Sequence, residues 1–169
     1  PLKCVVVTSS GPAEGKSTTV ANLAVTFSQS GSRVLILDAD LRKPRIHKMF
    51  GITNRVGTTN AIMDPDNVKD YIQNSVINGL HILTSGPIPP NPSELLGSKR
   101  MQNLITMLRD MYDFILIDTP PVCIVTDAQI LSTMADGTAI VAASGQVTIE
   151  ALNSAKTLLQ NVNASILGV

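Results

Sequence analysis

A short glycine-containing stretch near the start of the chain, Thr8–Thr18, constrains the fold more than any other feature of the sequence. The apolar run Lys3–Thr8 leads into it, and Lys16–Ser30, which repeats apolar residues at helical spacing, follows it. A turn of this kind between a strand and a helix gathers backbone N–H groups around one point, with the helix N-terminus behind them. The stretch therefore predicts an anion site, with a strand before it and a helix after it.

The same stretch fits the phosphate-binding pattern G-x-x-x-x-G-K-[ST] with one departure. Ser10 stands where the first glycine is expected, whereas Gly15, Lys16 and Ser17 match the pattern. In this pattern the lysine reaches the outer phosphates and the hydroxyl binds Mg²⁺. The alternative is a chance match in an ordinary turn, and the flanking strand and helix patterns weigh against it.

The rest of the chain alternates strand-like and helix-like segments. The expected strands are Lys3–Thr8, Arg33–Asp38, Leu80–Thr84, Phe114–Asp118, Thr138–Ala143 and Ala164–Val169. The expected helices are Lys16–Ser30, Ser98–Met111, Asp127–Ala135 and Thr148–Val162. Several strands are apolar throughout, which is typical of strands buried on both faces of a parallel sheet. We therefore expect one α/β domain at residues 1–169 with a doubly wound, mostly parallel sheet.

Two segments interrupt this alternation. Leu41–Ile77 is long and reads as short helices and loops. Ser85–Ser93 contains four prolines, and because proline fixes φ and removes a donor, we expect a stiff loop there. Long loops in a compact domain are often functional.

The composition limits the classes of partner. The 13 basic residues balance 13 acidic ones, there is no tryptophan and aromatic residues make up 3% of the chain, which argues against nucleic-acid binding. Cys4 and Cys123 lie in apolar runs and are expected to be small buried side chains. No apolar stretch reaches the roughly 18 residues that a membrane helix needs.

Carboxylates follow two of the expected strands. Asp38 and Asp40 come at the end of the second strand, and Asp118 ends the run Phe114–Asp118. Ligands bind at the carboxyl ends of the strands in sheets of this kind, so these side chains should lie beside the phosphate loop. Asp38 and Asp40 suit a metal ligand and a general base, and Asp118 has the Walker B form that serves Mg²⁺.

A basic run follows the aspartate pair: Arg42, Lys43, Arg45 and Lys48, with His47 among them. A solvated face is the usual interpretation of such a run. The sharper interpretation is that it holds phosphate or an acidic peptide. Arg42 is the strongest candidate, because it is nearest in sequence to the aspartates.

Taken together, the motifs resemble those of the cytoplasmic catalytic domain of bacterial tyrosine kinases (BY-kinases) of capsule and exopolysaccharide systems. The resemblance lies in SSGPAEGKST, in LDADLRKP, and in FILIDTPP with SGPIPPNPSELL before it and VTDA after it. It extends from about Lys3 to Val169, and the proline-rich segment is its most discriminating part. One departure is Pro12-Ala13, where the family usually has Pro-Gly.

The resemblance implies a P-loop NTPase fold of the MinD/ParA type and an autophosphorylating tyrosine kinase that uses ATP and Mg²⁺. The expected nucleotide-binding residues are Gly11, Pro12, Ala13, Glu14, Gly15, Lys16, Ser17 and Thr18. The expected catalytic residues are Lys16, Asp38, Asp40 and Arg42, and the expected metal ligands are Ser17, Asp38 and Asp118. Whether Asp38 or Asp40 is the base stays open.

The resemblance also implies partners and a location. We expect a membrane activator of the polysaccharide co-polymerase type, and tyrosine-containing substrates that include the protein itself. The domain would lie at the cytoplasmic face of the membrane, held by a partner or by a membrane segment outside this sequence. The N-terminal arm that builds ring-like homo-oligomers and the C-terminal tyrosine cluster are absent from residues 1–169, so we expect a catalytic core of a longer protein.

Two other functions stay open. An ATPase of the MinD/ParA type shares the fold, but its signature lysine near the loop start is replaced here by Ser9-Ser10-Gly11-Pro12. An ATP-binding regulatory scaffold for a membrane partner would bind the nucleotide without efficient transfer, and the complete aspartate set argues against it.

Overall fold

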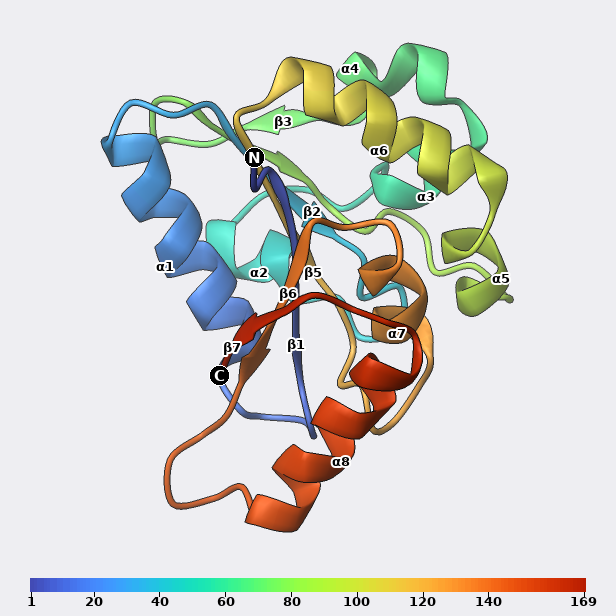
Figure 1. The fold of residues 1–169 in the computed structure, drawn as a ribbon. Helices are drawn as coiled ribbons and strands as arrows, with labels where there is room; N and C mark the ends of the chain where they lie inside the picture. The colour runs from blue at the N-terminus through green and yellow to red at the C-terminus, as the bar shows by residue number, and fades with distance from the viewer.

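The computed structural model, which describes residues 1–169, has one seven-stranded sheet at its centre (Figure 1). The strands are β1 (Cys4–Ser9), β2 (Val34–Asp38), β3 (Gln73–Asn74), β4 (Leu80–Leu83), β5 (Phe114–Asp118), β6 (Gly137–Val141) and β7 (Ile166–Gly168). Their order is β3-β4-β2-β5-β1-β6-β7, and all neighbours pair in parallel except the edge strand β3. The predicted doubly wound, mostly parallel sheet is confirmed.

Helices connect the strands and cover both faces of the sheet (Figure 1). They are α1 (Lys16–Gln29), α2 (Ile46–Phe50), α3 (Thr58–Met63), α4 (Val68–Tyr71), α5 (Pro92–Leu96), α6 (Lys99–Met111), α7 (Asp127–Ser132) and α8 (Ile149–Asn161), with a 3-10 turn at Pro65–Asn67. None of these helices is both long and apolar enough to cross a membrane.

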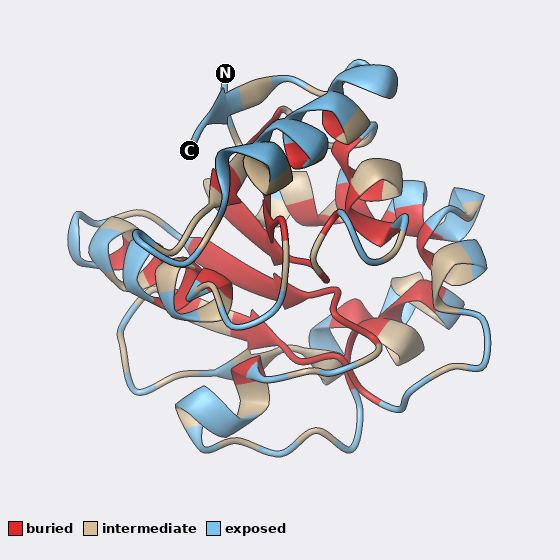
Figure 2. Cartoon of the chain, turned by 90° about the horizontal axis from the view of Figure 1, so that it is seen from below, coloured by how far each residue is buried: buried red, intermediate tan, exposed pale blue.

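Successive side chains of the central strands enter two separate cores, because they point to opposite faces of the sheet. On β1, Cys4 and Val6 join the core that includes side chains of α3, α6 and α7. Val5 and Val7 join the core with α1 and α2. Figure 2 shows the resulting buried centre with more exposed helices around it. The continuous apolar runs in the sequence therefore reflect burial on both faces.

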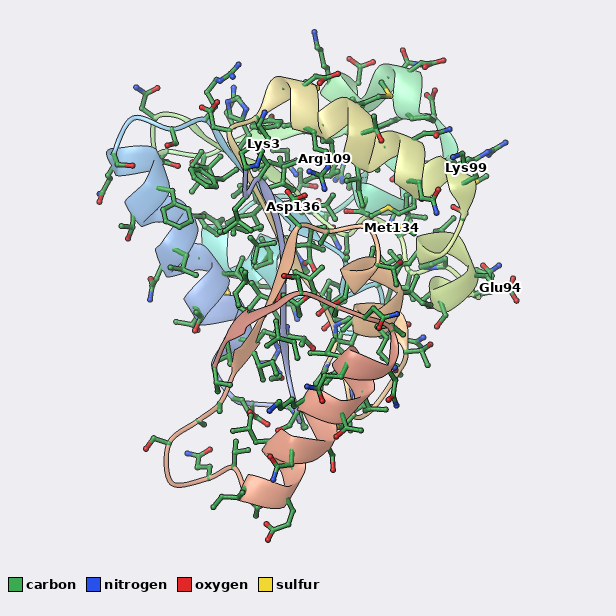
Figure 3. All side chains as sticks on the ribbon, in the orientation of Figure 1. Lys3, Glu94, Lys99, Arg109, Met134 and Asp136 are labelled. Atoms are coloured by element: carbon green, nitrogen blue, oxygen red, sulfur yellow. The ribbon has the colours of Figure 1, made fainter.

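The strand register brings the carboxyl ends of β1, β2 and β5 to one edge of the sheet. Asp38 of β2 pairs with Asp118 of β5, and Asp118 also pairs with Val7 of β1. The loop that leaves β1 therefore lies beside both aspartates. At the opposite edge of the sheet, Lys3, Arg109 and Asp136 meet near the start of β1 (Figure 3).

Some local predictions were incomplete or wrong. The two-residue strand β3 lies in Leu41–Ile77, which was expected to hold only short helices and loops. Helix α5 begins inside the proline-rich segment, because Pro92 occupies its first turn, where a missing N–H is tolerated. Cys4 is buried as expected, but Cys123 is exposed, since PVCIV forms a turn after β5 rather than a strand.

Candidate nucleotide-binding site

The loop between β1 and α1 is held in shape by its own side chains. Glu14 Oε1 accepts a hydrogen bond from the Gly11 N–H at 2.7 Å and one from the Ser10 hydroxyl at 2.6 Å. Gly15 precedes α1 with a φ of 81°, a left-handed conformation that glycine adopts freely. Ala13 also has a positive φ, of 58°, which is uncommon for a residue with a Cβ.

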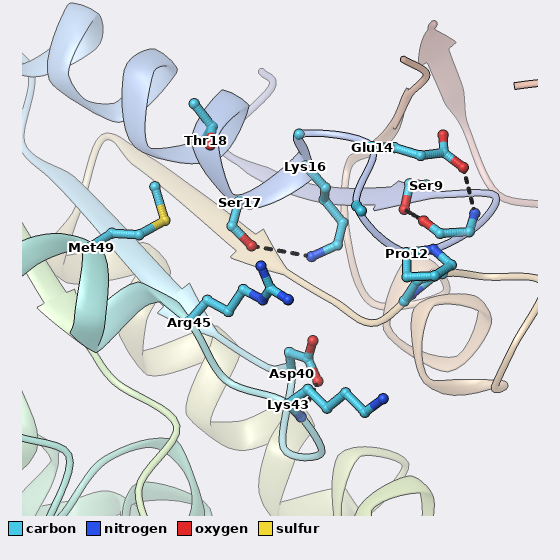
Figure 4. A pocket seen from close by; sticks show the side chains of 14 residues that line it. Ser9, Pro12, Glu14, Lys16, Ser17, Thr18, Asp40, Lys43, Arg45 and Met49 are labelled. Carbon is cyan, nitrogen blue, oxygen red and sulfur yellow. Dashed lines mark hydrogen bonds between the residues drawn. The ribbon is translucent and has the colours of Figure 1, made fainter. Parts of the chain in front are cut away.

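This loop forms one wall of a pocket of about 270 Å³ (Figure 4). The lining residues are Ser9, Gly11, Pro12, Ala13, Glu14, Gly15, Lys16, Ser17, Thr18, Asp40, Lys43, Arg45, Met49 and Pro121. All eight loop residues expected from the sequence are among them, together with Asp40. The pocket contains cationic side chains from both of its walls, Lys16 on one and Lys43 and Arg45 on the other, which suits an anionic ligand.

Asp118 joins the lysine and the serine of the loop. Lys16 Nζ donates to Asp118 Oδ1 at 2.6 Å, and Ser17 Oγ donates to Asp118 Oδ2 at 2.8 Å. Burial raises the pKa of Asp118, while Lys16 and Ser17 act in the opposite direction. Residues far apart in the sequence thus meet in direct contact, as expected for a Walker A and Walker B pair.

Asp38 lies next to Asp118 but has few partners of its own. It is fully buried at the end of β2, and its Oδ1 accepts the Asp40 N–H at 3.1 Å. Its other oxygen, Oδ2, is buried without a hydrogen-bond partner. Burial, followed by the charges of Asp118 and Asp40, raises the pKa of Asp38 well above its ordinary value. Such an oxygen suits a bound cation or a proton.

Asp40 differs from Asp38 because it lines the pocket. The N–H groups of Arg42 and Lys43 donate to its Oδ1 at 3.2 and 2.9 Å, so the turn after the residue orients the carboxylate. Its Oδ2 makes no hydrogen bond within the chain, although Asp40 as a whole residue is only 9% exposed. The geometry leaves this second oxygen able to accept a proton or a hydrogen bond from a ligand.

The basic run is divided between two places. Arg42 does not line the pocket: its guanidinium pairs with Asp127, with the Nε–Oδ2 distance at 2.9 Å. Lys43 and Arg45 line the pocket instead, and Figure 4 shows Arg45 pointing toward Lys16 and Ser17. Proximity in sequence favoured Arg42, whereas the direction of each side chain depends on a turn that the sequence pattern did not specify.

The side chains at this edge fit Mg²⁺ with a phosphate ligand. No group of three acidic, histidine or cysteine side chains forms a metal cage. Mg²⁺ needs none, because it usually keeps waters and binds through one or two carboxylates and the phosphates of a substrate. The candidate metal ligands at this edge are all oxygen atoms, from Ser17, Asp118 and the unpartnered oxygen of Asp38. The fold and the loop thus define the class of protein, a P-loop NTPase.

The comparisons with known proteins agree with this class and narrow it. A family model described as "ParA: NUBPL iron-transfer P-loop NTPase" matches residues 2–169. The tyrosine-protein kinase YwqD of Bacillus subtilis (strain 168) is 47% identical over 167 residues, which cover 99% of this chain and 70% of YwqD. The chain belongs to the family of bacterial tyrosine-protein kinases, within the ParA-type P-loop NTPases.

Two solved structures are similar over almost the whole chain. The crystal structure of the chimerical protein CapA2B2 has a TM-score of 0.96 and 41% identity, and the match covers 100% of this chain and 75% of the chimera. The kinase domain of the Escherichia coli tyrosine kinase ETK has a TM-score of 0.94 and 32% identity, covering 98% of this chain and 65% of that domain.

Proposed function

We propose that the chain is an ATP- and Mg²⁺-dependent protein tyrosine kinase that regulates capsular or exopolysaccharide synthesis. The observation that carries the proposal is that Lys16 and Ser17, which bond to Asp118, line one pocket together with Asp40. The names of the relatives, which are tyrosine kinases, support the same reaction. The class of reaction is phosphoryl transfer, which depends mainly on positioning and on charge stabilisation.

The loop would bind the phosphates of ATP. The backbone N–H groups of Ala13–Thr18 and the N-terminus of α1 would surround the anion, and the Lys16 ammonium would neutralise charge on the outer phosphates. Ser17, Asp118 and Asp38 would hold Mg²⁺, which when bound supplies further neutralisation of the phosphate oxygens. Lys43 and Arg45 add positive charge on the opposite wall of the pocket.

Asp40 is our candidate for the general base. The phenolic oxygen of the incoming tyrosine attacks the γ-phosphorus, the bond to the ADP oxygen breaks, and Asp40 accepts the phenolic proton. Asp38 is less suited to this role, because it is fully buried and does not line the pocket. Arg42 would act through its neighbours rather than on the phosphate, since its guanidinium is engaged by Asp127.

The partners belong to the same proposal. Residues 1–169 would be the single catalytic domain of a longer protein, with substrate tyrosines on other proteins and in a C-terminal cluster outside this sequence. A membrane protein of the polysaccharide co-polymerase type would activate the domain at the cytoplasmic face of the membrane, and the longer protein would form a ring-like homo-oligomer. The similarity to the CapA2B2 chimera supports an association of this kind.

An ATPase of the ParA type is the second candidate, because the matching family model carries that name. The loop start, Ser9-Ser10-Gly11-Pro12, has no lysine of the kind expected there in such ATPases. The two candidates differ in the acceptor of the γ-phosphoryl group, which is a tyrosine in one and water in the other. The product of the reaction therefore separates them.

In the experiment the chain is incubated with γ-³²P-ATP, Mg²⁺ and a tyrosine-rich peptide, with and without the cytoplasmic segment of a co-polymerase partner. The product that carries the ³²P label is then identified. We expect labelled phosphotyrosine, and its loss in Lys16→Met, because the outer phosphates lose their cation. The matched control is Lys156→Met, which removes an exposed lysine of α8 and should keep full activity. Label found only as free phosphate would support the ATPase, and nucleotide binding with neither product would support a scaffold.

A further inference from the structure

Three sequence motifs that the phosphate loop does not use meet at one buried carboxylate, Asp127. Arg42 belongs to LDADLRKP, Ser93 to SGPIPPNPSELL and Asp127 to VTDA. In the fold they lie after β2, in the first turn of α5 and at the first residue of α7. We refer to Arg42, Ser93 and Asp127 as the clamp.

The hydrogen bonds of the clamp form a closed ring. Arg42 donates from Nε to Asp127 Oδ2 at 2.9 Å and from Nη2 to Asp127 Oδ1 at 3.0 Å. The Ser93 hydroxyl donates to Asp127 Oδ1 at 2.7 Å and accepts from Arg42 Nη2 at 2.9 Å. The Asp127 side chain is fully buried, whereas that of Arg42 is 34% exposed. A two-point contact with a guanidinium fixes direction as well as distance.

The clamp is connected to the proposed base through the backbone of one residue. The Arg42 N–H donates to Asp40 Oδ1 at 3.2 Å, and the next N–H, of Lys43, donates to the same oxygen at 2.9 Å. The side chain of Arg42 is thus anchored on α5 and α7 while its backbone orients the carboxylate in the pocket. Movement of the Arg42 side chain would move the turn, and with it the Asp40 carboxylate.

We propose that Arg42, Ser93 and Asp127 are positioning residues, which hold the turn 40–43 so that Asp40 faces the transferred group. This inference rests on the proposed function in that it takes Asp40 as the base. It explains what the proline-rich segment does: this stiff segment leads into α5 and delivers the Ser93 hydroxyl to Asp127. It also gives Arg42 a place in the reaction without contact with the phosphate.

The first test measures the turn directly, in the chain without nucleotide. Removal of Asp127 or of the whole Arg42 side chain endangers folding, because it leaves a buried group without its partner. Arg42→Lys keeps a cation beside Asp127 but loses the two-point contact, and Ser93→Ala removes one hydroxyl. We expect hydrogen exchange at the Arg42 and Lys43 amides to become about tenfold faster in Arg42→Lys, with less change in Ser93→Ala, while exchange in β1 and β5 is unchanged.

The matched control is Arg109→Lys. It weakens a second arginine–aspartate pair, Arg109–Asp136, at the opposite edge of the sheet. Arg109 Nη1 donates to both Asp136 oxygens, at 3.0 and 2.8 Å, and Nη2 donates to the Met134 carbonyl, so the substitution also disturbs a multi-point guanidinium contact, but Arg109 makes no hydrogen bond to the turn 40–43. In Arg109→Lys, the rate of hydrogen exchange at the Arg42 and Lys43 amides should equal that of the unmodified chain.

The second test separates binding from transfer in the labelled-phosphate assay. We expect Arg42→Lys to lower kcat about tenfold and to leave the KM for ATP within about twofold, because only the base is displaced. Arg109→Lys should keep both values. Unchanged amide exchange in Arg42→Lys, or faster exchange with an unchanged kcat, would overturn the inference. An unmodified chain that makes no phosphotyrosine would instead overturn the proposed function, and the exchange result would still decide whether the clamp holds the turn.

Discussion

Neighbouring aspartates at the site differ in what compensates their charge. Asp118 receives hydrogen bonds from Lys16 and Ser17, whereas Asp38 receives one backbone N–H and keeps a buried oxygen without a partner. A buried carboxylate without a cation costs free energy, and such costs are usually retained at functional sites. We therefore infer that Asp38 lowers the free energy of unfolding of the chain without ligand, and that its role is to bind a ligand.

The first prediction concerns Asp38→Asn. The substitution removes the buried charge and its repulsion with Asp118, so we expect the free energy of unfolding without Mg²⁺ and nucleotide to rise by about 1–2 kcal/mol. The melting temperature should rise by about 2–8 °C, while phosphotyrosine formation falls. Thermal denaturation measures the effect, and Asp70→Asn, at an exposed position of α4, is the control. A lower melting temperature in Asp38→Asn would contradict the account.

The second prediction concerns Ala13, at the position where the kinase family usually has glycine. Its φ of 58° is unfavourable for a residue with a Cβ, so Ala13→Gly should raise the free energy of unfolding by about 0.5–1 kcal/mol. The greater conformational entropy of glycine in the unfolded chain opposes this gain and reduces it. Asn163 also has a positive φ, of 56°. Because asparagine tolerates this conformation, Asn163→Gly should have a smaller effect. Equal effects in urea denaturation would show that backbone strain at Ala13 is unimportant.

Whole elements are joined at the edge of the sheet opposite to the pocket, where Asp136 lies between α7 and β6 (Figure 3). Its Oδ2 accepts the N–H groups of Lys3 and Cys4, at 2.9 and 2.8 Å, and so fixes the start of β1. Arg109 of α6 donates to both oxygens of Asp136 and also to the Met134 carbonyl. One carboxylate therefore ties a strand, a helix and a loop together.

The third prediction follows from the pKa of Asp136, which is lowered to about 2. Burial alone would raise this pKa, but the hydrogen bonds from Arg109, Cys4 and Lys3 outweigh it. Since the folded pKa lies below the unfolded one, the stabilisation is full above about pH 4 and is lost as the pH falls toward 2.

Asp136→Asn should therefore lower the free energy of unfolding by about 1–2 kcal/mol at pH 7, with allowance for partial exposure to solvent. The difference from the unmodified chain should shrink between about pH 4 and pH 2. Urea denaturation across this range measures it, and Asp110→Asn, at an exposed position of α6, is the control. A difference that is constant with pH would rule out ionisation of Asp136 as the cause.

The elements that the sequence predicts well are those whose residues are buried on both faces or belong to a motif. The run Phe114–Asp118 is a strand within its expected bounds, because each of its faces meets a separate core. Strand β3 carries no such signal: its two residues pair with β4 only because the chain returns beside that strand. The burial of Cys123 was predicted wrongly for a related reason, because the apolar run after β5 forms an exposed turn.

The same reasoning applies to the site. The phosphate loop and Asp40 could be predicted, since a motif and a strand end fix where they lie. The separation of Arg42 from Lys43 and Arg45 could not, because it depends on Asp127, which is distant in the sequence. The signal that existed was the presence of Ser93 and Asp127 in motifs that the nucleotide does not require.

The chain has a net charge of zero, but charged side chains are concentrated at one edge of the sheet. Lys16, Lys43 and Arg45 line the same pocket as Asp40. The parallel sheet makes this possible, because the carboxyl ends of β1, β2 and β5 meet there. The fold thus brings cationic side chains and carboxylates together at one site, although the net charge of the whole chain does not indicate which ligand binds there.

In the reaction we propose, the groups that bind ATP and the group that receives the tyrosine proton are different residues of one pocket. The most direct measurement compares Asp40→Asn with the unmodified chain, in Mg²⁺·ATP affinity and in the rate of phosphotyrosine formation. We predict an affinity within about threefold, because the loop and Lys16 are intact, and a rate lower by about 100-fold or more. Phosphotyrosine formation at the unmodified rate in Asp40→Asn would contradict the account.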